Sequence, residues 1–236
     1  MRLSDFLLDR AIVEIRYPPA LLHWDRAGRL WSTMKGKWPE LRLHQAQPSQ
    51  TIFTLASPRR EAVVELEQAR IIEFKTDKAL PSFIEAVYDF FDVVLVTLEI
   101  DTIERIGFRQ IFLHKTQDAS TAAGLVADTG VLRLPPGSPF GITGKLLGPE
   151  YVVRWEGDTL GVRAALKAET RTLDYNPPPS TPELDAFRRE THGVVCDVDL
   201  FTTQPITVDQ LNVREWLQQA ALTVHRDAES LLGGWR

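Results

Sequence analysis

The chain has 236 residues, of which 44% are hydrophobic and 25% charged, with 14 glycines and 15 prolines. This composition is close to the average for soluble globular proteins and excludes fibrous, low-complexity and disordered classes. The length fits one large domain or two small ones that share a core. The net charge of -5 disfavours general nucleic-acid binding, since duplex-binding proteins normally gather a basic excess on one face.

The cysteine content and the N-terminal segment indicate a cytoplasmic protein. Cys196 is the only cysteine, so no disulfide can form within the chain. Residues 1–9 lack the unbroken apolar region and the small-residue cleavage site of a secretory signal. The most apolar run, residues 90–100, is interrupted by Asp92 and Glu99 and is too short for a membrane span.

In the first half, strand and helix patterns alternate. A period of two predicts a strand over residues 11–17, and tryptophans at helical spacing predict a helix over 20–38 whose buried stripe includes Trp24 and Trp31. The motif Ser82-x-x-Glu85 predicts the cap of a second helix, which runs to residue 98. Further strands are expected over residues 51–55, 62–67, 70–75 and 105–112.

Periodicity lapses over residues 116–150, and the proline-rich segment 134–139 predicts a linker or crossover there. Beyond it we expect a hairpin of strands 151–156 and 160–167, a short helix after Ser180, and a strand over 193–201. Thr207 is expected to cap a long C-terminal helix. The predicted fold class is α+β, with two halves, 1–115 and 151–236, each an antiparallel or mixed sheet with helices mainly on one face.

Familiar catalytic and cofactor motifs are absent from the sequence. There is no P-loop, no Gly-x-Gly-x-x-Gly and no Gly-x-Ser-x-Gly, and the five histidines are scattered without the spacing of a zinc site. Cys196 lies on the apolar side of its strand, which is typical of a small buried residue rather than a nucleophile. We therefore expect no metal and no cofactor.

Two pairs of charged residues remain as candidates. Asp197 and Asp199 stand two apart on one strand, so both carboxylates point to the same side and could chelate magnesium or share a proton. We favour a solvated strand face, on which exchange of either residue for Asn changes stability by less than about 0.5 kcal/mol. Arg105 and Arg109 could bind an anion, although pairing with Glu65, Glu67 or Glu14 explains them without a ligand.

Four segments carry a resemblance to a known family. They are Ala11-Ile12-Val13-Glu14-Ile15-Arg16-Tyr17, the helix that ends Lys37-Trp38-Pro39, Glu104-Arg105-Ile106-Gly107-Phe108-Arg109, and Cys196-Asp197-Val198-Asp199-Leu200-Phe201 before a long terminal helix. In order and spacing the chain resembles an uncharacterised, sporadically distributed bacterial family of about this length. The resemblance implies a bacterial cytosolic α+β protein and no mechanism. Its sporadic distribution implies a defence or mobile-element locus.

Two functional hypotheses follow. The favoured one is a non-catalytic interaction protein or accessory subunit that binds another protein or its own copy, because a well-patterned chain carries no catalytic motif. The alternative is an enzyme or small-ligand binder that uses Asp197, Asp199 and the arginines Arg105 and Arg109, brought together from the two halves. A pocket that unites these residues with perturbed carboxylates would favour the alternative.

Overall fold

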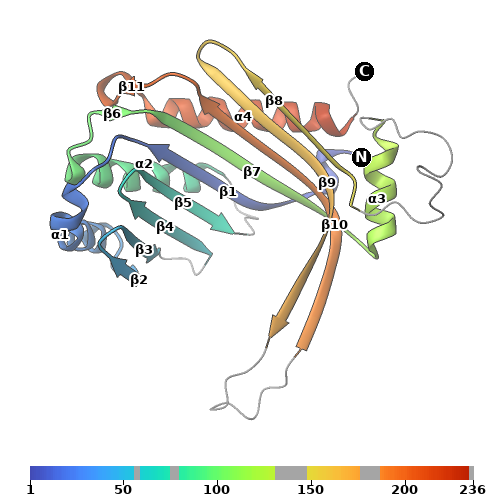
Figure 1. The fold of residues 1–236 in the computed structure, drawn as a ribbon, viewed down its shortest axis with the longest axis horizontal. Helices are drawn as coiled ribbons and strands as arrows, with labels where there is room; N and C mark the ends of the chain where they lie inside the picture. The colour runs from blue at the N-terminus through green and yellow to red at the C-terminus, as the bar shows by residue number, and fades with distance from the viewer. Residues whose placement is uncertain (56–58, 75–79, 131–147, 176–186, 234–236) are drawn as a thin grey trace.

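The structure is a computed structural model that describes residues 1–55, 59–74, 80–130, 148–175 and 187–233. Nine strands form one antiparallel sheet in the order β2-β3-β4-β5-β1-β7-β10-β9-β8 (Figure 1). The strands are β1 (Leu7–Arg16), β2 (Arg42–Gln47), β3 (Gln50–Thr54), β4 (Arg60–Glu65), β5 (Gln68–Phe74), β7 (Arg105–Thr116), β8 (Glu150–Glu156), β9 (Leu160–Tyr175) and β10 (Phe187–Thr202). Two short strands, β6 (Thr102–Ile103) and β11 (Ile206–Thr207), pair separately.

Helices cover one face of this sheet. They are α1 (Leu22–Lys37), α2 (Leu80–Leu98), α3 (Ala119–Asp128) and α4 (Val213–Leu232), together with the short 3-10 helices Leu3–Asp5 and Val208–Gln210. The core lies between the sheet and this helical layer. It contains the inward sides of the strands, such as Val13, Phe108 and Cys196, and the apolar stripes of the helices, such as Phe90 and Val224.

The α+β class and the antiparallel sheet with helices on one face are confirmed, but two separate sheets are not what the structure shows. The central strand β7 pairs with β1 on one side and with β10 on the other, so strands from both expected halves join one sheet. The expected linker over 116–150 contains helix α3, and its residues 131–147 lie outside the described part of the chain. The division into domains therefore stays a prediction.

Several predicted elements are present within two or three residues of their expected bounds, whereas β1 begins four residues earlier and β7 ends four residues later than expected, and three details of the helices differ. Trp24 is 58% exposed, because the buried side of α1 runs through His23, Leu30 and Met34. Helix α2 begins at Leu80, so Ser82 lies inside its first turn.

The third difference is the start of the C-terminal helix. Asn212 caps α4 by accepting a hydrogen bond from the backbone N–H of Glu215, whereas Thr207 precedes a 3-10 turn and makes no side-chain cap. The short helix expected after Ser180 lies outside the described residues. Strand β2 and helix α3 were not expected, and β9 and β10 are longer than predicted.

The outer parts of β9 and β10 run past the other strands as a two-stranded ribbon, which projects from the body of the molecule (Figure 1). This ribbon extends from the pair Arg171–Thr191 to the pair Tyr175–Phe187. None of the described helices is both long enough and apolar enough to cross a membrane.

Candidate functional site

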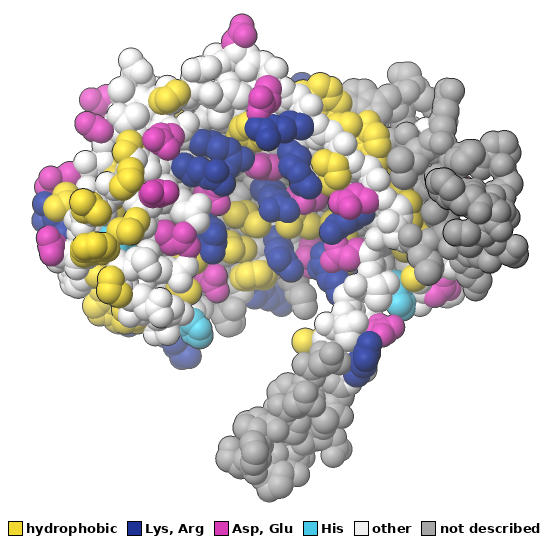
Figure 2. Space-filling model, viewed as in Figure 1, with side chains coloured by type: hydrophobic (Ala, Val, Ile, Leu, Met, Phe, Trp, Pro, Cys, Tyr) yellow, Lys and Arg dark blue, Asp and Glu magenta, His cyan; other side chains and the backbone are white. Residues whose placement is uncertain are grey.

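The face of the sheet opposite the helical layer, here called the open face, carries polar side chains from strands across the whole sheet. Figure 2 looks onto it and shows Lys and Arg gathered over its middle, with Asp and Glu between them. A small apolar cluster of Ile111, Leu113 and Val195, with Ile12 against it, lies on the same face. These apolar and charged side chains share one face because the pleat turns every second residue of a strand to the same side.

In the ion pairs of the open face the carboxylate is less exposed than the arginine that it binds, by a wide margin at Asp197 and Glu14 and by a small one at Asp199. The side chain of Asp197 is 8% exposed, whereas its partners Arg109 and Arg163 are 41% and 39% exposed. The same order holds for Glu14 under Arg16, at 19% and 54%. A partner that approaches this face therefore meets guanidinium groups first, although the chain as a whole is acidic.

Asp197 is held by a two-pronged ion pair. Arg109 donates from Nε to Oδ1 at 2.7 Å and from Nη2 to Oδ2 at 2.5 Å, and Arg163 Nη1 lies 3.5 Å from Oδ2. The hydrogen bonds to Asp197 raise the pKa of Arg109. The expectation of a solvated strand face is therefore wrong for Asp197, because the β7–β10 pairing places Arg109 beside it.

Arg105 binds two carboxylates. It donates from Nη2 to Asp199 Oδ2 at 2.7 Å and from Nη1 to Glu14 Oε1 at 3.3 Å, and Arg16 Nε also donates to that Glu14 oxygen at 2.9 Å. Burial raises the pKa of Asp199, and Arg105 opposes this shift. Of the expected cross-strand partners, Glu14 is the one that Arg105 contacts.

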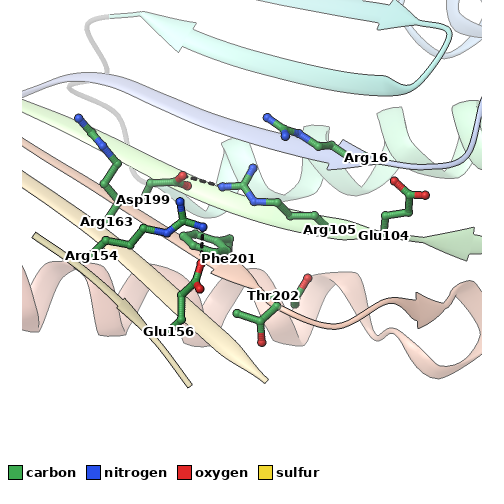
Figure 3. A pocket seen from close by; sticks show the side chains of 10 residues that line it. Arg16, Glu104, Arg105, Arg154, Glu156, Arg163, Asp199, Phe201 and Thr202 are labelled. Carbon is green, nitrogen blue, oxygen red and sulfur yellow. Dashed lines mark hydrogen bonds and ion pairs between the residues drawn. The ribbon is translucent and has the colours of Figure 1, made fainter. Parts of the chain in front are cut away.

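Beside these pairs a cavity of about 450 Å³ opens on the face (Figure 3). Its lining includes four arginines, Arg16, Arg105, Arg154 and Arg163, and three carboxylates, Glu104, Glu156 and Asp199. Phe201 forms its floor, where it is 6% exposed.

Two glycines create the space for this floor. In the sheet register Phe201 stands opposite Gly107 on one side and Gly161 on the other. A Cβ at Gly161 would lie 2.5 Å from the Phe201 ring, and a Cβ at Gly107 would lie 3.3 Å from the Arg105 guanidinium. The Phe201 ring therefore occupies a position that glycine at 161 leaves free, whereas a side chain at position 107 would need the Arg105 guanidinium to move by a few tenths of an ångström.

A second cavity, of about 620 Å³, shares Arg16 and Glu104 with the first. Its other lining residues are Ser49, Glu65, Leu66, Glu67 and Gln68, on the side of β4 and β5. The two adjacent cavities thus differ in charge, because arginines predominate in the first and glutamates in the second.

The structure brings all four candidate site residues, Asp197, Asp199, Arg105 and Arg109, to the open face. Cys196 instead points into the core, and burial raises its pKa to about 12, so its thiol stays protonated. Within the described ranges, His, Cys, Asp and Glu side chains form no group of three or more that could hold a metal. Sequence reasoning missed Arg154, Arg163 and Phe201 as site residues.

A scan against protein-family models and a search of curated proteins found no match to this chain. The family resemblance of the sequence therefore stays a prediction.

Proposed function

We propose that this protein is a non-catalytic interaction protein, an accessory subunit that binds an acidic segment of a partner protein on the open face of its sheet. The observation that carries the proposal is the layering of charge on this face, with carboxylates beneath and guanidiniums outermost. Each guanidinium has five N–H donors, and the ion pairs use only some of them. The remaining donors suit the carboxylates of a partner.

The same layering favours a protein over a nucleic acid. Affinity for nucleic acid grows with the number of phosphates that a protein neutralises. Here each arginine is compensated by a carboxylate close to it, such as Asp197 below Arg109 and Glu14 below Arg16. The electrostatic potential of the open face therefore falls off over a short distance, and the choice of partner depends on direct hydrogen bonds.

The proposed setting is the bacterial cytoplasm, in a defence or mobile-element locus. The support for this setting comes from the sequence, through its single cysteine and its family resemblance.

A labelled peptide of consecutive glutamates tests the proposal by fluorescence anisotropy. Arg10 and Lys167 are partly exposed and lie on the open face, opposite Ile111 and Val195. We expect the wild-type protein to bind this peptide and the variant Arg10→Glu/Lys167→Glu to lose most of the binding. The control Arg29→Glu/Arg226→Glu makes the same change in net charge on α1 and α4 and should bind like wild type.

Three results would contradict the proposal. The first is equal loss of binding in both variants, and the second is tighter binding of a single-stranded oligonucleotide than of the peptide. The third is a dimer by light scattering that dissociates in Arg10→Glu/Lys167→Glu, because the occupant of the face would then be a second copy.

One observation favours a second candidate, the small-ligand binder or enzyme that the sequence left open. Asp199 lines the cavity beside Arg105, and burial raises its pKa. A carboxyl group in such a setting can act as an acid or a base. The test is whether Asp199→Asn changes binding of small anions in the cavity as pH is varied.

A further inference from the structure

Two pairs of arginines stand directly opposite each other on neighbouring strands around one cavity. Arg16 of β1 is opposite Arg105 of β7, and Arg154 of β8 is opposite Arg163 of β9. Like charges at directly opposed positions destabilise a sheet. Arrangements of residues that lower stability are concentrated at functional sites. Here both pairs of opposed arginines line the same cavity.

Two of these guanidiniums also meet over the same aromatic ring. Arg105 and Arg154 reach toward Phe201 from opposite sides (Figure 3), and their Cζ atoms lie 4.4 and 5.6 Å from the ring centroid. Asp199 compensates Arg105, and Glu156 compensates Arg154. The ring face attracts both guanidiniums but carries no charged group between them.

Arg154 and Arg163 have N–H donors that remain available for a ligand. Arg163 makes one contact of 3.5 Å to Asp197, and its other N–H groups have no hydrogen bond to the residues that the structure describes. The Arg154 side chain is 64% exposed and contacts Glu156 on its own strand. Arg154 can therefore turn toward an anion by leaving a half-exposed carboxylate, and Arg163 by giving up one long contact, while Asp197 keeps its two hydrogen bonds from Arg109.

We propose that this cavity is a subsite for an oxyanion, a carboxylate or phosphate group, held by Arg154 and Arg163 and flanked by the Arg16–Arg105 pair. The anion offsets the repulsion between Arg154 and Arg163, which share no carboxylate, whereas Glu14 already accepts hydrogen bonds from both Arg16 and Arg105. This inference rests on the proposed function, since an acidic side chain of the partner segment is one source of the group. Free phosphate is the other source of the same chemistry.

Thermal unfolding and calorimetry test the subsite with two probes, inorganic phosphate and a blocked tri-glutamate peptide, at an ionic strength matched with NaCl. The variant is Arg154→Gln and the control is Arg29→Gln, an exposed arginine on α1. We expect wild type and control to gain melting temperature with a probe. Arg154→Gln should bind that probe about tenfold more weakly, as for one lost charge-assisted hydrogen bond.

The unliganded proteins give an independent readout. Arg154→Gln removes one member of a repelling pair, so without a probe it should melt at the same temperature as wild type or higher. An arginine with a merely structural role would give a lower melting temperature. A lower value together with unchanged binding of both probes would overturn the subsite.

The outcomes also separate this inference from the proposed function. If the long glutamate peptide binds wild type and Arg154→Gln equally well, and neither phosphate nor the tri-glutamate peptide binds in an Arg154-dependent way, the subsite is wrong and the open-face proposal stands. If phosphate binds in an Arg154-dependent way and neither glutamate peptide binds, the subsite stands with free phosphate as its ligand and the proposed function is wrong. If no probe binds wild type, both are wrong.

Discussion

At the scale of single residues, the ion pair between Asp197 and Arg109 is a structural element of the open face. The carboxylate is nearly inaccessible to water and accepts two hydrogen bonds from one guanidinium. Arg109→Gln would leave this carboxylate with only the long contact to Arg163. We expect a loss of about 2–3 kcal/mol in the free energy of unfolding, measured by urea denaturation.

A double-mutant cycle separates the pair from its surroundings. The double variant Asp197→Asn/Arg109→Gln should lose clearly less free energy of unfolding than the two single variants lose together. The reason is that in the double variant neither partner is left as an unpaired buried charge. Strict additivity would show that the two side chains do not depend on each other.

The raised pKa of Asp199 predicts that the stability of the protein depends on pH. Burial raises its pKa in the folded state above its ordinary value of 3.8. The folded protein therefore holds this proton more tightly than the unfolded chain, so the contribution of Asp199 to stability falls as pH rises from about 4 through the folded-state pKa.

The variant Asp199→Asn isolates this contribution from other carboxyl groups, such as Glu169, whose pKa is lowered. Between pH 4 and 7, the unfolding free energy of wild type minus that of the variant should decrease with rising pH. A difference that increases with pH would contradict the raised pKa, since a lowered pKa has the opposite slope.

At the scale of elements, helix α1 offers a matched pair of tryptophans. Trp31 is partly buried and stacks on Phe53 of β3 at a centroid distance of 6.2 Å, whereas Trp24 is exposed. We expect Trp31→Ala to lower the free energy of unfolding by about 2–3 kcal/mol, somewhat less than for a fully buried aromatic residue.

Trp24→Ala should change the free energy of unfolding by less than about 0.5 kcal/mol. Urea denaturation of both variants measures the difference. A large loss from Trp24→Ala, equal to that from Trp31→Ala, would mean that the side of α1 that carries Trp24 is buried against something in solution.

Elements with a clear apolar period were predictable from the sequence, and elements without one were not. From Ala11 onward, strand β1 alternates buried and more accessible positions, and α2 has a broad apolar stripe. Strand β2 is a polar edge strand with no buried position, so it carries no such pattern. Asn212 was missed as a cap because the Thr207 motif also matches a capping box and lies just before it.

At the scale of the whole molecule, the pairing of distant strands could not be predicted. The register that places Asp199 opposite Arg109 joins residues 90 positions apart, and no local pattern encodes it. The sequence singled out Asp197, Asp199, Arg105 and Arg109 one strand at a time, and their mutual ion pairs follow from the β7–β10 pairing.

The cavity was even less predictable from the sequence than these ion pairs, because it forms only in the tertiary structure. Its arginines come from four different strands, and its floor needs Phe201 to lie between two glycines on neighbouring strands. In the sequence Arg154 and Arg163 are ordinary polar positions of two alternating strands. Their significance appears only when both stand around the same cavity.

The measurement that tests the central claim most directly is photo-crosslinking with a glutamate peptide that carries a benzophenone group, followed by mass spectrometry. If the open face receives an acidic segment, crosslinks should fall on its side chains in β7, β8, β9 and β10, and Arg10→Glu/Lys167→Glu should remove them. Crosslinks concentrated on α1 or α4, unchanged in that variant, would contradict the account.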